Sequence, residues 1–346
     1  MRVALDATYS VDPNPSGIAV YSRELLRGLI AAHPNDEFLL CYRLKQFRHA
    51  PRMGYPHVHK RPLLPALPTF RADLFHGLNQ RIDKRAARIV VSTFHDLFVI
   101  TGDYSTPEFR ARFTKQAKQA AANSDVVIAV SEFTAFQICS LLGFDRKSIY
   151  VVPHGVRVPE GDVPTTAERS KMILFVGALQ VRKNISRLVS AFEAVPNDWS
   201  LVLAGAPSGF QADRILEQIE ASPARQRIRV CGYLPKTQLQ HLYQQASIFA
   251  FPSLDEGFGM PVLEAMAHGA PVLTSNRSAT AEIGVGAALL VDPESEAAIA
   301  AELVRMIRDP QLRTTLMERG RIRAREYTWQ RACNATYAIY SELKNT

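Results

Sequence analysis

The sequence is poor in cysteine and has no apolar run long enough to cross a bilayer. Its 346 residues include four cysteines, each more than ninety residues from the next and none in a Cys-x-x-Cys pair: Cys41, Cys139, Cys231 and Cys333. This spacing argues against a zinc ribbon or redox pair and predicts reduced thiols. No apolar run approaches the roughly 18 residues of a membrane helix. The N-terminal stretch also lacks the apolar core and cleavage site of a secretory signal. We therefore expect a cytoplasmic protein.

The dinucleotide-binding fingerprint is incomplete at both places where it could stand. Gly257 and Gly259 precede an expected helix, but Val262 occupies the place of the third glycine. After the first expected strand, the chain offers only Gly17. Both gaps count against a nicotinamide or flavin dehydrogenase.

Short apolar runs alternate with segments of helical period along the whole chain. The length, with 47% hydrophobic and 21% charged residues, fits two globular domains. Strand–helix alternation predicts parallel sheets with helices on both faces, hence an α/β fold of two Rossmann-like doubly wound domains. Helices are expected at residues 17–32, 107–123 and 131–142. Strands are expected at 2–5, 37–42, 88–93, 125–130, 149–152, 171–177, 200–205, 227–232, 247–253, 270–275 and 287–291.

The polar, proline-containing segment 157–171 is the best domain linker in the chain. We expect one domain over residues 1–160 and a second over 161–328. A final helical segment, residues 329–346, could cross back to the first domain. Doubly wound folds place ligands at the carboxyl ends of their strands, which is where candidate site residues should be sought.

Positive charge is concentrated in the first half of the chain. The net charge is +8, and residues 1–160 carry 21 Lys and Arg against 14 Asp and Glu, or +7. An anionic substrate, an anionic membrane surface or a nucleic acid could account for this excess. We expect no nucleic acid, because no recognisable module or interleaved aromatic pattern is present. Residues 43–70 and 110–118 combine basic and apolar side chains and could contact an anionic membrane peripherally; the alternative is a solvated basic face.

The segment 251–275 carries the densest information. A strand ends at Pro252, and Glu256 precedes the glycine-rich step that opens a helix at Met260. Glycines allow backbone to approach a ligand, and free N–H groups at a helix start favour phosphate. Glu264 lies about one turn into this helix, so both glutamates could face one ligand. Taken singly, each glutamate also fits an ordinary helix charge.

A second cluster follows the strand that opens the second domain. Arg182 and Lys183 precede a helix expected to start near Asn184. There they could neutralise a departing diphosphate, which places charge stabilisation where charge develops. The alternative is an exposed Arg-Lys pair.

Together these segments resemble the retaining glycosyltransferases of family 4, which have the GT-B fold. The two glutamates of EGFGMPVLE (256–264) are the family's most characteristic feature. The resemblance extends from about residue 1 to residue 340 through further segments: SGIAVYSREL (16–25), STFHDLF (92–98), VSEFT (130–134), VVPHGV (151–156), VGALQVRKN (176–184), GYLPKTQLQHLYQQASIFAFPSLDEGFG (232–259) and YTWQRACNATYAIY (327–340).

The resemblance implies two domains that face a central cleft, the first binding the acceptor and the second a nucleotide-diphospho-sugar. It implies a hexosyltransferase that retains anomeric configuration. Arg182 and Lys183 resemble the pair that stabilises the leaving diphosphate. Glu256 and His95 resemble residues close to the transferred sugar. The residues expected to be catalytic are therefore His95, Arg182, Lys183 and Glu256. The remaining expected contacts are Gly17, Asp96, Leu234, Gly257, Phe258, Gly259 and Met260, with Glu264 on the ribose.

Two departures from the family pattern bear on the donor. Ala178 stands where relatives often have arginine after the glycine of the phosphate loop, so leaving-group stabilisation falls on Arg182 and Lys183. Lys236 stands where readers of guanine can have an acidic residue, and lysine offers no acceptor. The carbonyl of Leu234 could serve instead. Because VGALQVRKN (176–184) looks most like the mannosyl- and related hexosyltransferases of bacterial surface-polysaccharide assembly, GDP-mannose is the first expectation and a UDP-hexose the second.

Neither a metal nor another cofactor is expected, because no Asp-x-Asp occurs anywhere in the chain. The acceptor should be a glycan or lipid-linked glycan, reached at the inner face of the cell membrane if the basic segments bind there. Two alternatives remain open: another enzyme of the same architecture, such as a sugar-nucleotide epimerase or phosphorylase, and a non-catalytic nucleotide or nucleic-acid binder.

Overall fold

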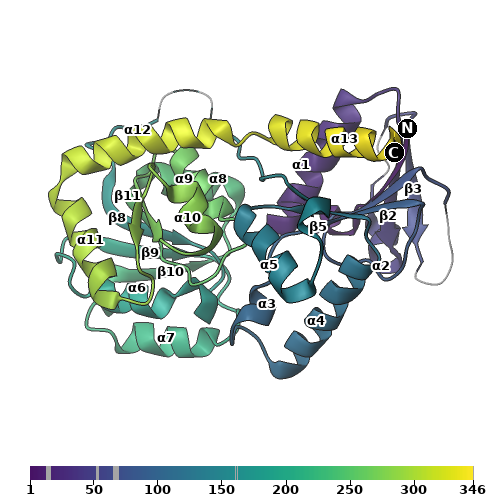
Figure 1. The fold of residues 1–346 in the computed structure, drawn as a ribbon. Coiled ribbons are helices and arrows are strands. Elements are labelled where there is room, and N and C mark those ends of the chain that lie inside the picture. Colours follow the sequence, from purple (N-terminus) through teal and green to yellow (C-terminus); the bar gives the residue numbers. More distant parts are fainter. Residues whose placement is uncertain (13–16, 52–53, 65–69, 160, 162, 346) are drawn as a thin grey trace. The chain divides into compact units, whose positions relative to one another are not determined.

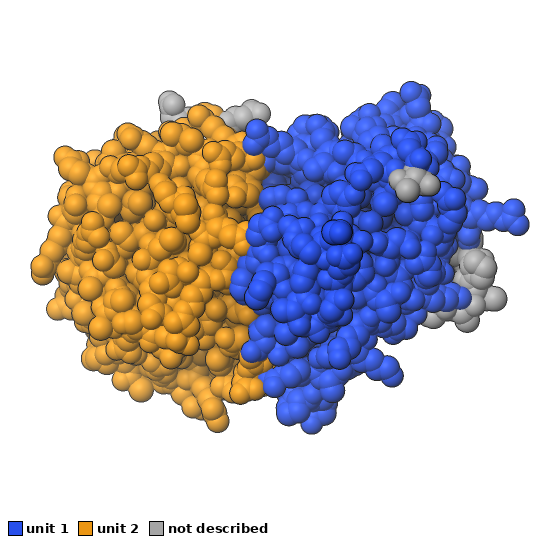
Figure 2. All heavy atoms as spheres, in the orientation of Figure 1, with its two compact units in different colours: residues 1–101, 106–155, 328–346 blue, residues 102–105, 156–327 orange. Residues whose placement is uncertain are grey.

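The chain forms two compact units, coloured separately in Figure 2. The structure, a computed structural model, describes residues 1–12, 17–51, 54–64, 70–159, 161 and 163–345. Unit 1 comprises residues 1–101, 106–155 and 328–346, and unit 2 comprises residues 102–105 and 156–327. Apart from the short segment 102–105, the chain passes between units after Gly155 and after Tyr327, where the sequence predicted boundaries at 160 and 328.

Unit 1 is built on a seven-stranded parallel sheet with the order β3-β2-β1-β4-β5-β6-β7. Its strands are β1 (Arg2–Asp6), β2 (Glu37–Arg43), β3 (Val58–Leu63), β4 (Leu74–Gly77), β5 (Ile89–Phe94), β6 (Val126–Ala129) and β7 (Ile149–Val151). Its α-helices are α1 (Gly17–Ala32), α2 (Leu44–His49), α3 (Phe98–Thr101), α4 (Pro107–Ala122), α5 (Glu132–Leu142) and α13 (Trp329–Asn345).

Side chains of β2 alternate between two hydrophobic clusters, one on each face of this sheet. Phe38 and Leu40 join a cluster that includes residues of α1 and α13. Leu39 and Cys41 join another that includes residues of α4 and α5. Because successive strand side chains point to opposite faces, a continuous apolar run predicts a strand covered on both sides. Figure 1 shows α13 beside α1, so the last helix of the chain completes unit 1.

The strands β3 and β4 were not predicted. β3 carries Lys60, Arg61 and Pro62 and pairs only with β2 at the sheet edge, where proline is tolerated. Lys60 and Arg61 are half-buried rather than exposed, and Lys60 Nζ donates to the carbonyl of Ala50 at 2.6 Å. Of the basic and apolar segment 43–70, residues 52–53 and 65–69 lie outside the described residues.

Unit 2 contains a six-stranded parallel sheet with the order β10-β9-β8-β11-β12-β13. Figure 1 shows α9 and α12 on one side of this sheet and α6 and α7 on the other. The strands are β8 (Ser170–Val176), β9 (Ser200–Ala204), β10 (Ile228–Gly232), β11 (Ala246–Phe251), β12 (Val272–Ser275) and β13 (Leu289–Val291). The α-helices are α6 (Ile185–Phe192), α7 (Ala212–Ala221), α8 (Lys236–Gln245), α9 (Met260–Ala267), α10 (Ser278–Gly284), α11 (Glu296–Arg308) and α12 (Pro310–Glu326).

The strand order of unit 2 reverses between β8 and β11. From β8 the chain builds outward to β9 and β10, then returns to pair β11 with the other side of β8. Ligands in doubly wound folds bind outside the carboxyl ends of the strands at such a switch point. No described helix is long and apolar enough to span a membrane.

Candidate active site

The switch point of unit 2 brings together the two clusters that the sequence singled out. Arg182 and Lys183 belong to a short 3-10 helix, η3 (Val181–Lys183), which follows β8. Glu256 lies in the loop between β11 and α9. Because β8 and β11 are neighbours in a parallel sheet, residues 73 positions apart meet at the same edge.

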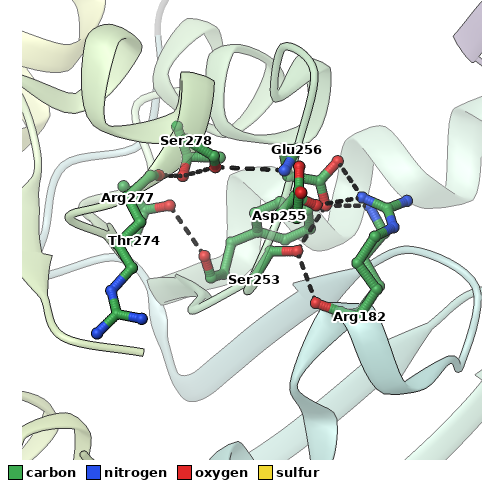
Figure 3. Close-up of polar contacts among 10 residues, drawn as sticks. Arg182, Ser253, Asp255, Glu256, Thr274, Arg277 and Ser278 are labelled. Atoms are coloured by element: carbon green, nitrogen blue, oxygen red, sulfur yellow. Dashed lines mark hydrogen bonds and ion pairs between the residues drawn. The ribbon is translucent and has the colours of Figure 1, made fainter. Parts of the chain in front are cut away.

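The carboxylate of Glu256 lies between two cations. Lys183 Nζ is 2.6 Å from Oε1, and Arg182 Nη1 is 2.8 Å from Oε2. All three side chains are at most 10% exposed. Ser253 Oγ also donates to Oε1 at 2.6 Å. In Figure 3, the side chain of Arg182 points toward the loop after β11 that carries both Ser253 and Glu256. The cations are therefore neither exposed nor free of a countercharge, unlike the ordinary surface pair that was the alternative.

Electrostatics of this cluster favour the ionised carboxylate. Burial alone would raise the pKa of Glu256, but the charges of Arg182 and Lys183 outweigh it and lower the pKa to about 2. The buried Asp255 precedes Glu256 in the same loop, and its carbonyl accepts a hydrogen bond from Arg182 Nη1. Two cations held at this edge would attract an incoming diphosphate more strongly than a neutral ligand.

Three polar side chains that sequence reasoning missed hold the cluster in place. Asn184 has a left-handed backbone (φ 58°), and its Nδ2 donates to the carbonyls of Pro252 at 2.9 Å and Pro293 at 2.6 Å. Ser278, also left-handed (φ 58°), accepts from the backbone N–H of Glu256 at 3.2 Å. Together with Ser253, these residues tie η3 to the loop after β11. The sequence signal that could have revealed Asn184 is its place directly after the cationic pair, since asparagine tolerates the left-handed backbone region better than most residues.

Gly259 shapes the start of α9. Its φ of 113° is one that side chains rarely adopt, and an added Cβ would lie 3.1 Å from Thr280 Cγ2. The helix then begins at Met260 with Pro261 in its first turn, where the missing N–H costs nothing. Gly257 and Phe258 are buried beside it. Val262 and Leu263 donate to the carbonyl of Gly259, so the positive end of the helix dipole, rather than a row of free N–H groups, favours a phosphate here.

Glu264 lies one turn into α9 and is half-buried. Burial raises the pKa of its carboxyl, opposed by a hydrogen bond from Tyr243 and the charge of Lys236. Leu234, half-buried, lies in the turn that joins β10 to α8. Every predicted site residue of the second half therefore lies on the loops and helix starts that follow the strands of unit 2.

The predicted residues of the first half belong to unit 1. His95 follows β5 and is buried, with Nε2 2.9 Å from the carbonyl of Leu78 and Nδ1 3.2 Å from Nε2 of His154. Burial lowers the pKa of His95 to about 4 and also lowers that of His154, so both rings are neutral at pH 7. His95 must then carry its proton on Nε2 and accept from His154 at Nδ1.

The hydrogen bonds of His95 bear on its expected role beside the transferred sugar. Both ring nitrogens are used inside unit 1, so the ring is not free to bond a sugar hydroxyl as it stands. Asp96, beside it, is half-buried and accepts through its carbonyl from Gln80 at 3.4 Å. Gly17 is exposed at the first position of α1, next to residues 13–16, which lie outside the described part of the chain.

Sequence comparisons assign the family. A family model described as Glycosyltransferase Family 4 matches residues 15–158, and one described as Glycosyl transferases group 1 matches residues 161–323. The chain belongs to the family 4 glycosyltransferases. The predictions of family, fold class and enzyme class, a hexosyltransferase, are thereby confirmed.

Relatives of this glycosyltransferase include enzymes of bacterial surface polysaccharides. The O-antigen chain mannosyltransferase B of Escherichia coli is 28% identical over 95% of the chain and 96% of its own length. Among solved structures, sucrose-phosphate synthase from Thermosynechococcus elongatus matches with a TM-score of 0.79 at 21% identity over 99% of both chains. Anabaena Alr3699/HepE, solved with UDP and glucose, matches with a TM-score of 0.73 at 16% identity, covering 98% of this chain and 99% of its own. The two structures share the fold.

Proposed function

We propose that this glycosyltransferase transfers mannose from GDP-mannose, with retention of configuration, to a glycan or lipid-linked glycan acceptor. The observation that carries the proposal is the buried cluster of Arg182, Lys183 and Glu256 at the switch point of unit 2. Its two cations suit a diphosphate, and α9 begins four residues after Glu256. The mannose assignment is supported by the O-antigen mannosyltransferase that aligns over nearly its whole length.

The residues of unit 2 suggest how the leaving group is stabilised. The bond between the sugar C1 and the β-phosphate oxygen breaks, and its electron pair stays on the diphosphate. The Lys183 ammonium, which donates to Glu256, supplies a positive charge for the phosphate oxygens. Arg182 and the positive end of the α9 dipole add further stabilisation where the charge develops.

The acceptor oxygen attacks the same face of the sugar, and its proton passes to the departing phosphate. Glu256 holds the cation pair and, where it faces the sugar, accepts from its hydroxyls. We propose that no metal takes part, since the cations and the helix end carry the charge that a metal would neutralise.

A UDP-hexose is the second candidate donor. Lys236 supplies no acceptor for guanine at the turn that precedes α8, which leaves the carbonyl of Leu234 for that role. The fold neighbour Alr3699/HepE was solved with UDP. Thermal shifts with GDP, UDP and ADP side by side should rank the bases, because a ligand of the native state stabilises by RT ln(1 + [L]/Kd).

Product analysis tests the reaction itself. Free GDP should accumulate from GDP-mannose only when an acceptor is present, and the product linkage should keep the α configuration of the donor. Release of GDP without acceptor would indicate hydrolysis, and conversion of the sugar without transfer would indicate an epimerase. An inverted product would contradict the proposed stereochemistry.

We further propose peripheral membrane contact through α4. Arg110, Lys115 and Lys118 line one shallow groove along this helix with Pro107 and Ala111. Basic residues beside apolar ones favour an anionic interface at about 1 kcal/mol each. Co-sedimentation with anionic vesicles at low salt should exceed that with neutral vesicles and fall at high salt. Equal, negligible sedimentation with both would refute the contact.

A further inference from the structure

Tyr243 makes a contact that the mechanism above does not use. Its phenolic Oη donates to Glu264 Oε2 at 2.9 Å. Within the described part of the chain, no other side chain donates to this carboxylate. Glu264 Oε1 therefore keeps its lone pairs for a ligand, while the hydrogen bond from Tyr243 fixes Oε2.

The phenol of Tyr243 is held on three sides. The side chain is only 2% exposed, and its ring stacks on His268 with centroids 5.6 Å apart and an interplanar angle of 5°. The ring centroid of Phe249, in β11, lies 5.7 Å from that of Tyr243. The backbone carbonyl of Tyr243 accepts a hydrogen bond from the buried Arg169 Nη1 at 2.9 Å. A side chain packed in this way cannot turn its hydroxyl away without repacking the core.

Helix α8 directs two groups toward Glu264. Lys236 and Tyr243 are seven residues apart, about two helical turns, so they lie on the same side of the helix. Both lower the pKa of the Glu264 carboxyl, against the burial that raises it. Burial outweighs both and leaves the pKa of Glu264 above its usual value, and of the two groups only the tyrosine fixes the orientation of the carboxyl by a hydrogen bond.

We propose that Tyr243 is a positioning residue for the donor nucleotide: it orients Glu264 so that Oε1 accepts hydrogen bonds from the ribose hydroxyls. This inference rests on the proposed function and on the role that the family resemblance implies for Glu264, the binding of the ribose. A carboxylate that is already oriented loses less conformational freedom when the nucleotide binds, and this raises affinity. Loss of the phenolic hydroxyl should therefore weaken the recognition of ribose rather than of phosphate or base.

The test compares ribose and deoxyribose nucleotides on matched variants. GDP and 2′,3′-dideoxy-GDP are titrated calorimetrically into the wild type, Tyr243→Phe, Glu264→Ala and the double variant, with the uridine pair run in parallel. Tyr150→Phe is the control, since Tyr150 donates to Glu342 Oε1 at 2.7 Å in unit 1. This substitution removes a hydrogen bond of the same kind, from a tyrosine to a glutamate, at a position outside unit 2.

We expect the wild type to prefer the ribonucleotide by about tenfold, the scale of a hydrogen bond to a charged group. Tyr243→Phe should weaken GDP about fivefold and leave dideoxy-GDP unchanged. Glu264→Ala should abolish the preference, and adding Tyr243→Phe to it should change nothing further. In turnover assays, Tyr243→Phe should raise KM for the donor with kcat unchanged, and Tyr150→Phe should change neither.

Equal weakening of both nucleotides by Tyr243→Phe would overturn the inference, because a merely structural residue would act on both. Additive effects in the double variant would overturn it as well. Both results leave nucleotide binding by the wild type intact, so the proposed function would survive them. If the wild type bound neither GDP nor UDP, the proposed function would fail and this inference with it.

Discussion

Replacing Glu256 by glutamine removes one negative charge from the cluster with Arg182 and Lys183 and keeps the shape of the side chain. The pKa of Glu256 falls from 4.5 to about 2, so the ionised form is favoured by interactions that the neutral form lacks. Each pKa unit corresponds to about 1.36 kcal/mol. At pH 7, Glu256→Gln should therefore lower the free energy of unfolding by about 3 kcal/mol. An exposed ion pair is worth only about 0–1 kcal/mol.

The sign of the pH dependence follows from the lowered pKa. The stabilisation by Glu256 is complete above pH 4.5 and is lost as the pH falls through about 2. Glutamine does not titrate, so the difference between wild type and Glu256→Gln should shrink over the same interval. At neutral pH, the two buried cations of the variant lose the negative charge of the Glu256 carboxylate, and a nucleoside diphosphate should replace part of it. GDP or UDP should therefore raise the stability of the variant more than that of the wild type.

The chain has two tryptophans, one in each unit, and this allows unit 2 to be followed alone. In a Trp329→Phe background, fluorescence reports on Trp199, which is 6% exposed in unit 2. Urea unfolding of this background, with and without Glu256→Gln and with and without nucleotide, gives the four stabilities required. Asp198→Asn is the control, because its pair with Lys171 is more than half exposed on both sides. Equal stability of Glu256→Gln and its parent, or a smaller nucleotide effect in the variant, would refute the reasoning.

Three further outcomes are expected. Lys183→Ala should lower turnover at least about a hundredfold, the usual scale for a lost transition-state contact, whereas the exposed Lys171→Ala should not; near-normal kcat in folded Lys183→Ala would remove the site assignment. Activity should be complete in excess EDTA, and a loss that Mn²⁺ or Mg²⁺ restores would show that a metal takes part. Unit 1 should lose stability as the pH falls from 6.5 toward 4, because burial lowers the pKa of His95 to about 4 and the unfolded chain then binds more protons. Trp329 fluorescence in a Trp199→Phe background measures this, and a flat profile between pH 7 and 4.5 would contradict it.

Strands with a continuous apolar run could be predicted, and strands without one could not. Each of the eleven runs singled out in the sequence overlaps a strand of the structure. β3 was missed because its charged residues and proline are acceptable only at a sheet edge, and sequence periodicity does not reveal which strand is an edge. β4 has four residues, one of them His76, and is buried by tertiary pairing with β1 and β5 rather than by its own hydrophobicity.

The candidate site was predictable where strand ends determine it. Arg182, Lys183 and Glu256 meet because parallel neighbours bring their carboxyl ends to one edge, and the sequence showed which strands precede them. Tyr243 could not be found in this way, since nothing in its helical segment distinguishes a core tyrosine from one that donates to a carboxylate. The partners of His95 likewise depend on the buried packing around it, which brings His154, 59 residues later, to its ring.

The position of α13 has a consequence for biosynthesis. Unit 2 is almost one continuous stretch, residues 156–327, whereas unit 1 is assembled from both ends of the chain. Ala332, Cys333, Ile339 and Tyr340 of α13 belong to the same core as Val3 and Leu25, and Tyr340 also contacts His76 of β4. During translation, the part of unit 1 that precedes unit 2 therefore keeps the apolar face that α13 covers exposed while unit 2 is synthesised. Unit 2 can fold as soon as it has emerged from the ribosome, whereas unit 1 reaches its final packing only after α13 has emerged.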